Sequence, residues 1–328
     1  MDALGGDQAP GAVIAGAILA ARDLDVSIRL VGPSSLLAQE LSRATGPEGT
    51  RVSIVDAPEG IGMEEAPLQA LRRKPRASVK VAAELVAQGG ADAVYSAGHT
   101  GATLMASHAA FGLLPGAERP ALAVLVPTLA GDAVLLDTGA TLDCRPEHLV
   151  AFARMGVAWS RIALGVEQPR VGLLSVGEEE GKGNDLVRAA AGLLRAAQDL
   201  HYVGNLEARD LFSGSTDVVV CDGFTGNVAL KVGEGLVDTL ERMLKREIGD
   251  SWAAHLANRL VGGGFKRLRR RVDAAERGGA PLLGVNGLVV VGHGRSTEQV
   301  VRNGIATAAQ LVRGDALARF REALRIAC

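Results

Sequence analysis

The sequence predicts an α/β protein with a layered helix–sheet–helix arrangement and a mostly parallel central sheet. Short β-branched runs alternate along the chain with longer runs rich in Ala and Leu, which is the pattern of successive strand–helix–strand units. The strand-like runs are apolar almost throughout, as expected of a sheet that is covered on both faces. Polar turns that contain glycine follow many of these runs.

Eight short runs are expected to form strands because Val, Ile and Leu dominate them. In chain order they are Ser27–Val31, Arg51–Val55, Asp92–Tyr95, Ala121–Val126, Ala133–Leu136, Val171–Val176, Asp217–Cys221 and Leu288–Val291. The expected helices between them are Ser34–Thr45, Ala77–Gln88, Pro146–Leu164 and Asp185–Ala197. Pro146 suits a first helical turn, which Asp143 is placed to cap. No linker or repeat divides the chain, so we expect one domain over residues 1–328.

The composition excludes several classes of protein. Of the 328 residues, 48% are hydrophobic and 22% charged, which suits a substantial core and not a disordered chain. A formal net charge of −2 argues against a general nucleic-acid binder. Three cysteines form no disulfide framework, and the opening residues do not resemble a signal peptide. We therefore expect a cytoplasmic protein.

Residues 234–273 predict a helical hairpin appended within this domain. Apolar residues recur every four positions from Ile248 to Leu260, and Gly262–Gly264 then ends the helix. Basic residues concentrate on its flanks. The hairpin either packs on the body or contacts an anionic membrane surface or an acidic partner. The residues expected at such a contact are Trp252, Leu256, Leu260, Phe265, Lys266, Arg267, Arg269 and Arg270.

Five glycine-containing turns are the main functional signal. The carboxyl ends of parallel strands gather at one edge of a sheet, where ligands bind. Glycine allows a ligand close to the backbone, and helix N-termini attract anions. The turns therefore predict an active-site edge that suits a phosphate-type ligand. They are Ser96–Gly101 (SAGHTG), Asp137–Gly139 (DTG), Gly177–Asn184 (GEEEGKGN), Asp222–Asn227 (DGFTGN) and Gly292–Ser296 (GHGRS).

Other familiar chemistries have no support in the sequence. Gly177–Gly183 has the wrong spacing for a P-loop, and no G-x-G-x-x-G follows a strand. No G-x-S-x-G or zinc-ligand cluster occurs. Cys144 and His148 stand four residues apart, so a nucleophile pair is one interpretation and a loop cysteine beside a helix start is the favoured one. Cys221 is expected to be a buried core thiol.

Eight segments, taken together, resemble the PlsX family of bacterial phosphate acyltransferases. They run in family order from Met1 to about Ser296 and cover nearly the whole chain. These segments are MDALGGDQAP, SAGHTG, ERPA, DTGATLDCRPEHL, VGLLSVGEEEGKGN, VGNLEARD, VVVCDGFTGNVALK and GVNGLVVVGHG.

The resemblance implies a reaction and a setting. It implies transfer of a long-chain fatty acyl group from acyl carrier protein to inorganic phosphate, giving acyl phosphate for phospholipid synthesis. It also implies a Rossmann-like fold similar to phosphotransacetylases and isocitrate-dehydrogenase-like proteins, and a homodimer attached peripherally to the inner face of the cell membrane. No metal or organic cofactor is expected, and a glycerol-3-phosphate acyltransferase is the implied downstream partner. The alternatives are an enzyme that uses acyl-CoA and a non-catalytic scaffold.

The resemblance also assigns site residues. Phosphate is itself a nucleophile, so the site needs groups that position anions and stabilise an oxyanion. Lys182 is expected to neutralise charge, and Asn227 to donate from its amide. Basic residues within Arg72–Arg76 could dock the acidic carrier protein. The residues expected to bind substrate or phosphate are Asp2, Gly5, Gly6, Asp7, Ser96, Gly98, His99, Thr100, Gly101, Asp137, Thr138, Gly139, Glu180, Asn184, Asp222, Gly223, Thr225, Gly226 and His293.

Two features depart from the family pattern. The family usually has asparagine where His99 stands, and histidine can still donate a hydrogen bond. Family members also usually have a short apolar strand before the first glycine turn, whereas Met1 here directly precedes Asp2. We expect either a start that lies upstream or a clipped first strand.

Overall fold

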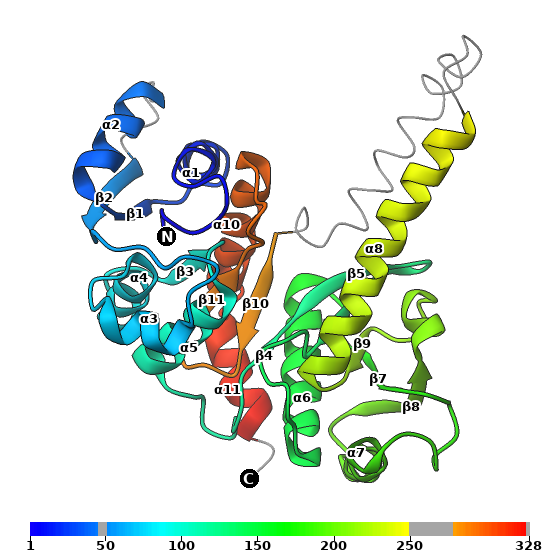
Figure 1. Ribbon diagram of the computed structural model, residues 1–328. Helices are drawn as coiled ribbons and strands as arrows, with labels where there is room; N and C mark the ends of the chain where they lie inside the picture. The colour runs from blue at the N-terminus through cyan, green and yellow to red at the C-terminus, as the bar shows by residue number, and fades with distance from the viewer. Residues whose placement is uncertain (45–50, 249–277, 326–328) are drawn as a thin grey trace.

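The computed structural model describes residues 1–44, 51–248 and 278–325, and the statements below concern that part of the chain. Strands and helices alternate along it (Figure 1). The helices are α1 (Gly11–Asp23), α2 (Ser34–Ala44), α3 (Pro67–Arg73), α4 (Ser78–Ala87), α5 (Thr100–Phe111), α6 (Pro146–Ala163), α7 (Asp185–Ala196), α8 (Gly223–Ile248), α10 (Glu298–Arg313) and α11 (Ala316–Arg325). The strands are β1 (Ile28–Gly32), β2 (Val52–Asp56), β3 (Ala93–Ser96), β4 (Ala121–Leu122), β5 (Val124–Thr128), β6 (Gly131–Leu136), β7 (Arg170–Ser175), β8 (His201–Glu207), β9 (Val218–Val220), β10 (Ala280–Leu283) and β11 (Leu288–Val291).

The predicted α/β class is confirmed, with the strands divided between two halves of the molecule. In the N-terminal half, β1 pairs in parallel with β2, and β3 in parallel with β11. Residues Met1–Ala3 lie between these pairs, because Asp2 N donates to Tyr95 O and Ala3 N donates to Val31 O, each at 3.0 Å. β10 runs antiparallel to β11 and extends this half to β4.

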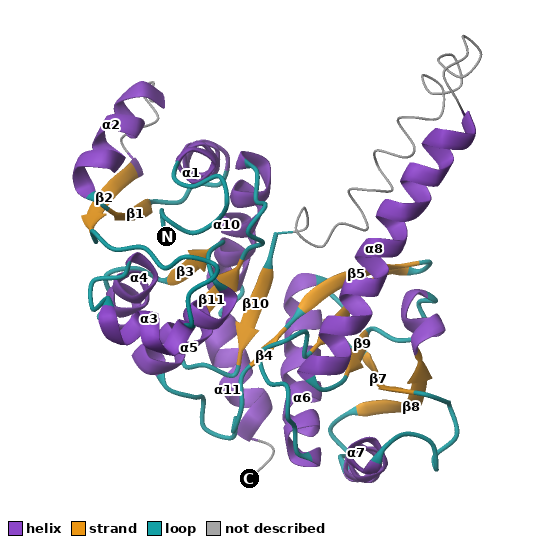
Figure 2. Cartoon of the chain, in the orientation of Figure 1, coloured by secondary structure: helices purple, strands orange, loops and turns teal. Residues whose placement is uncertain are grey.

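The second half is a five-stranded sheet in the order β5-β6-β9-β7-β8. Every neighbouring pair in it is parallel except β5 with β6. Val218, Val219 and Val220 of the central strand are fully buried, as expected of a strand with helices on both faces. Helices pack against the strands in both halves of the molecule (Figure 2).

The predicted strand Ala121–Val126 is divided in the structure and passes from one half to the other. Its first part pairs with β10 and its second part with β6. Between them, Ala123 N donates to Pro281 O at 3.0 Å. Strands β8 and β10 were not predicted, because Gly204 and Asn205 in β8 and Pro281 in β10 are residues that disfavour strands.

Helix α6 carries the largest buried side chains of the core. Phe152, Met155 and Trp159 are all buried there. The helix begins at Pro146 as predicted, but its N-cap is Arg145 and not Asp143. Proline restricts the residue before it to extended backbone, which places the cap at Arg145.

Helix α8 rises from the body and includes residues 234–248, the start of the predicted hairpin (Figure 1). The helix is continuous from Gly223, so Glu234 is an interior position and not the start of a separate element. The rest of the predicted hairpin, residues 249–273, lies outside the described residues, and this includes most of the apolar stripe and the turn Gly262–Gly264. No helix in the described ranges is long and apolar enough to cross a membrane.

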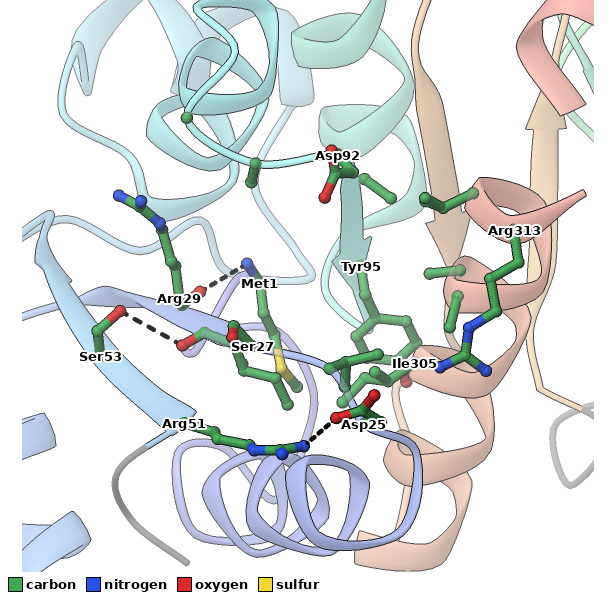
Figure 3. Close-up of a pocket in the computed structure, with 18 residues that line it drawn as sticks. Met1, Asp25, Ser27, Arg29, Arg51, Ser53, Asp92, Tyr95, Ile305 and Arg313 are labelled. Carbon is green, nitrogen blue, oxygen red and sulfur yellow. Dashed lines mark hydrogen bonds and ion pairs between the residues drawn. The ribbon is translucent and has the colours of Figure 1, made fainter. Parts of the chain in front are cut away.

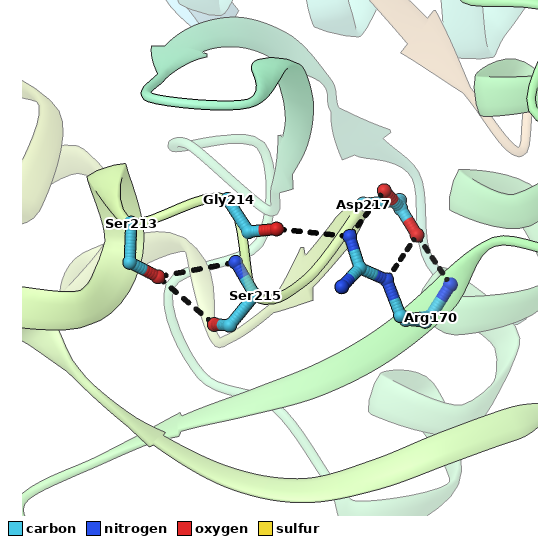
Figure 4. Close-up of polar contacts among 5 residues, drawn as sticks. All are labelled: Arg170, Ser213, Gly214, Ser215 and Asp217. Carbon is cyan, nitrogen blue, oxygen red and sulfur yellow. Dashed lines mark hydrogen bonds and ion pairs between the residues drawn. The ribbon is translucent and has the colours of Figure 1, made fainter.

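An ion pair joins the amino ends of the two neighbouring strands β7 and β9 (Figure 4). Arg170 donates from Nε to Asp217 Oδ2 at 2.9 Å and from its second terminal nitrogen to Oδ1 at 3.0 Å. The Arg170 backbone N–H also donates to Oδ2, at 2.8 Å. These hydrogen bonds from Arg170 lower the pKa of Asp217.

Asp217→Asn is expected to lower the free energy of unfolding at pH 7 by about 1 kcal/mol, because partial exposure screens the pair. The contribution of the carboxylate is complete above its unfolded pKa, about 3.9. It is lost as the pH falls through the lower folded pKa. Urea unfolding of both proteins should show a difference that shrinks below about pH 4. A difference that stays constant down to pH 2 would contradict the ion pair.

Candidate active site

A cavity of about 610 Å³ lies away from the predicted turns (Figure 3). It is lined by the loop before β1, the start of β3 and one face of α10. An ion pair of 2.5 Å between Arg51 and Asp25 lies at one side of it. The cavity faces the amino ends of the strands, whereas the glycine turns follow the carboxyl ends. It is therefore not the candidate site.

The turn after β6, residues 137–141, is built around the buried carboxylate of Asp137. Its Oδ1 accepts hydrogen bonds from the backbone N–H groups of Leu122 at 2.8 Å, and of Gly139 and Ala140 at 3.0 Å. Its Oδ2 accepts from Thr141 N at 2.6 Å. Burial raises the pKa of Asp137, and the four donors oppose that effect. We call residues 137–141 the Asp137 turn.

The first turn of α8 packs directly on the Asp137 turn. A Cβ on Gly226 would lie 1.9 Å from Asp137 O, so only glycine fits there. Asp222 caps the helix, because its carboxylate accepts from Thr225 N at 2.9 Å and from Thr225 Oγ1 at 2.7 Å. The Asn227 side chain is exposed, lies close to Gly139, and has no hydrogen-bond partner within the described residues.

Lys182 lies in the loop after β7. Strand β7 is the neighbour of β9, the strand that leads into α8. The Lys182 side chain is exposed and makes no ion pair with any described residue. The neighbouring Glu180 pairs with Arg195 of α7 at 2.7 Å and not with Lys182. Asn184 caps α7 by accepting from Val187 N at 2.9 Å. Lys182 is thus the available cation of this loop.

In the N-terminal half, the buried carboxylate of Asp2 organises the turns around it, as Asp137 does in the other half. The Asp2 carboxylate accepts from Ser78 Oγ at 2.6 Å and from Ser96 Oγ at 2.7 Å. Ser96 Oγ in turn accepts from Gly98 N at 3.2 Å. A Cβ on Gly5 would lie 2.6 Å from Gly98 N, so the two turns touch through their backbones.

The start of α5 is open. His99 is its N-cap but makes no side-chain capping bond, and its buried Nδ1 has no partner within the described residues. The N–H groups of Thr100 and Gly101 in the first turn have no hydrogen-bond acceptor there either. By contrast, Asn184 and Thr297 cap α7 and α10 with their side chains.

The structure brings the predicted site residues together in two groups, one in each half. Within the described ranges, no hydrogen bond joins the two groups. Three backbone N–H groups that were expected to hold phosphate already donate within the chain: Gly98 to Ser96, Gly139 to Asp137, and Gly226 to Asp222. Thr138 Oγ1 donates to Leu122 O at 3.0 Å. Asp7 and His293 are exposed.

The cysteines do not form a nucleophile pair with histidine. Burial raises the pKa of Cys144 to about 12, and its Sγ faces Thr141 O at 3.5 Å. His148 Nδ1 instead accepts from Arg145 N at 3.0 Å. Cys221 is buried, as predicted. Among the described residues, no cluster of His, Cys, Asp or Glu side chains could hold a metal ion.

The hydrogen-bond partner of Asp2 was not predicted from the sequence, and the predicted hairpin contacts lie outside the described residues. Ser78 holds Asp2, yet it is 76 residues away in sequence and no motif marks it. The predicted contact residues of the hairpin lie outside the described residues: Trp252, Leu256, Leu260, Phe265, Lys266, Arg267, Arg269 and Arg270.

Comparisons with known proteins match nearly the whole chain to one family. A family model described as "Fatty acid synthesis protein" matches residues 1–319. A curated protein from Nitratidesulfovibrio vulgaris (strain DP4), named phosphate acyltransferase, is 47% identical over 312 residues, covering 95% of this chain and 90% of the relative. One of the same name from Heliobacterium modesticaldum is 46% identical over 322 residues, covering 98% and 96%.

The solved structures agree in fold. A phosphotransacetylase from Streptococcus pyogenes superposes with a TM-score of 0.61 and covers 91% of both chains. Its sequence identity of 20% limits this likeness to the fold.

Gly226→Ala is expected to lower the melting temperature strongly. Its new Cβ would collide with the backbone oxygen of Asp137, at a cost of at least about 3 kcal/mol. Gly235→Ala on the same helix is the matched control, because no neighbouring atom lies within 4 Å of the added Cβ. Its better helix propensity should raise stability by up to about 1 kcal/mol. Calorimetry that gave both variants the same melting temperature would refute the packing.

Proposed function

Because the chain belongs to the PlsX family of phosphate acyltransferases, we propose that it transfers a long-chain fatty acyl group from acyl carrier protein to inorganic phosphate. Family membership makes it an acyltransferase enzyme. The observation that carries the proposal is the match of the family model over residues 1–319. The product would be an acyl phosphate, which a glycerol-3-phosphate acyltransferase could consume in phospholipid synthesis.

We place the acceptor phosphate at the start of α5. Its first-turn N–H groups are free, and the helix dipole favours an anion there. His99 Nδ1 is an additional buried group that lacks a partner in the described chain. The start of α8 suits an anion less well, because the Asp222 carboxylate already occupies it.

Lys182 and Asn227 supply the charge and the donor that the reaction needs. The phosphate oxygen attacks the thioester carbon, and negative charge develops on the former carbonyl oxygen before the thiolate leaves. Both side chains are exposed and neither has an internal partner among the described residues, so both are free to meet substrate. A donor positioned for a developing oxyanion contributes about 3–4 kcal/mol.

Acyl carrier protein is proposed as the acyl donor because of a basic surface beside α5. Arg72 and Arg73 are exposed on α3, which packs on α5, and neither guanidinium forms an ion pair with described residues. Lys74 and Arg76 are occupied, by Glu65 at 2.6 Å and by Asp56 at 2.8 Å. Two exposed arginines without an ion pair among the described residues, on a helix that packs on α5, suit an acidic carrier protein. An acyl-CoA donor is the alternative.

We also propose a homodimer that forms through α8. Six apolar side chains form one exposed stripe along this helix, and each is between 47% and 65% exposed. A stripe of this length is typical of a surface that packs on another protein. A second copy of the chain would cover it with an identical stripe. The residues are Phe224, Val228, Val232, Leu236, Leu240 and Met243.

Peripheral attachment to the cytoplasmic face of the membrane stays a prediction of the sequence. Its support is the basic composition of residues 259–271, which lie outside the described part of the chain. Sedimentation with anionic vesicles at low and high salt is the measurement that checks it. The assignment of residues 1–328 to one domain likewise stays a proposal.

Lys182→Ala and Asn227→Ala are each expected to lower kcat about 10²- to 10³-fold in a phosphate-dependent assay with long-chain acyl carrier protein. Lys231→Ala is the matched control, because this lysine is ion-paired to Glu234 on the exposed side of α8. It should keep the activity of the unmodified protein. Acyl-CoA is assayed in parallel. Turnover with acyl-CoA alone would contradict the carrier-protein donor, and no turnover with either would leave a scaffold.

Val232→Asp combined with Leu236→Asp should convert the dimer to a monomer. Removing two apolar side chains from the interface costs at least about 3 kcal/mol, which weakens association more than about a hundredfold. Lys231→Asp is the control, since it adds a carboxylate without removing apolar surface. Sedimentation velocity at micromolar concentration distinguishes the species. An unmodified chain that sediments as a monomer would rule out the proposed interface.

A further inference from the structure

We infer that Asp137 is the positioning residue for Asn227 and acts through the Asp137 turn without touching substrate. The inference rests on the proposed function for the catalytic role of Asn227, and on the geometry for everything else. It revises the expectation that Asp137 itself binds phosphate.

The Asp137 carboxylate is closed to substrate. The residue has no exposed surface. Both of its oxygens accept hydrogen bonds from backbone N–H groups, at distances between 2.6 and 3.0 Å. One donor, Leu122, belongs to β4, and the others belong to the turn itself. The carboxylate therefore fixes the turn on the end of its sheet.

The Asp137 turn in turn limits where the Asn227 amide can lie. A Cβ on Gly139 would be 2.7 Å from Asn227 Nδ2, so the amide rests against this glycine. Gly139 adopts a φ of +134°, which glycine tolerates far better than other residues. Because Asn227 has no hydrogen-bond partner in the described chain, its contact with Gly139 is an important restraint on its side chain.

A second path leads from the carboxylate to the helix that carries Asn227. Asp137 Oδ2 accepts from Thr141 N, and Thr141 O accepts from Gly223 N at 2.9 Å. Gly223 is the first residue of α8. The Asp137 oxygen that binds Thr141 is thus linked through one residue to the helix start. Loss of this oxygen should shift both the turn and the first turn of α8.

The test is a double-mutant cycle. Asp137→Asn keeps one oxygen but places an amide against Thr141 N. It should lower kcat about tenfold to a hundredfold, the scale of a misplaced catalytic group, with the KM for phosphate changed less than threefold. In the Asn227→Ala background it should cost less than threefold more, because its effect passes through Asn227. Asp217→Asn is the control for a purely structural loss and should leave kcat unchanged. Additive losses would overturn the proposal.

A second measurement does not depend on turnover. In an ¹⁵N NMR spectrum, the side-chain amide signal of Asn227 is identified by its absence in Asn227→Ala. It should move in Asp137→Asn and stay in place in Asp217→Asn. An unmoved signal would overturn the positioning role even if the enzyme is active. An inactive unmodified protein would refute the proposed function while this readout still decides the geometry. If Asp137→Asn does not fold, Gly139→Ala tests the same contact from the turn.

Discussion

The buried Asp137 carboxylate joins the backbones of the two halves of the molecule at a place where they meet. It binds the backbone of β4, which belongs to one half, from the end of β6, which belongs to the other. A carboxylate that is desolvated must be compensated by donors, and four N–H groups provide this compensation. The Asp137 turn is bonded directly to this carboxylate, and the start of α8 is bonded to the turn through Thr141 O and Gly223 N.

The polar residues of the site divide into those that build the turns and those left for substrate. Asp2, Ser96, Asp137 and Asp222 are bound to groups of the chain, so their carboxylates and hydroxyl hold the turns. This division has an electrostatic benefit: the N–H donors partly offset negative charge that would otherwise oppose a phosphate. Among the described residues, the groups available to substrate include the Lys182 ammonium, the Asn227 amide, the His99 ring and the uncapped start of α5.

The sequence supported the fold because burial on both faces produces apolar strands that are easy to recognise. It did not reveal β8 and β10, where packing against neighbours overrides residues with poor strand propensity. The Asp137–Gly139 and Gly177–Asn184 segments are turns or loops as predicted, because conformation is largely local, whereas Gly223–Asn227 of the predicted turn Asp222–Asn227 is the first turn of α8. Which polar groups stay free is not local: Ser78 reaches Asp2 across 76 residues, and Arg195 removes Glu180 from the neighbourhood of Lys182.

The length of helix α8 links the candidate site to a distant part of the molecule. Its 26 residues span about 39 Å at the usual rise per residue, and it begins one turn before the side chain that faces Gly139. In a continuous helix of this length, a small change of tilt at the site becomes a large displacement at the other end. A tilt of one degree about its first turn displaces the far end by about 0.7 Å. A contact that fixes the far end of α8 therefore also restricts the orientation of the helix at Asn227. The close packing of Gly226 on the Asp137 backbone fixes the position of the first turn.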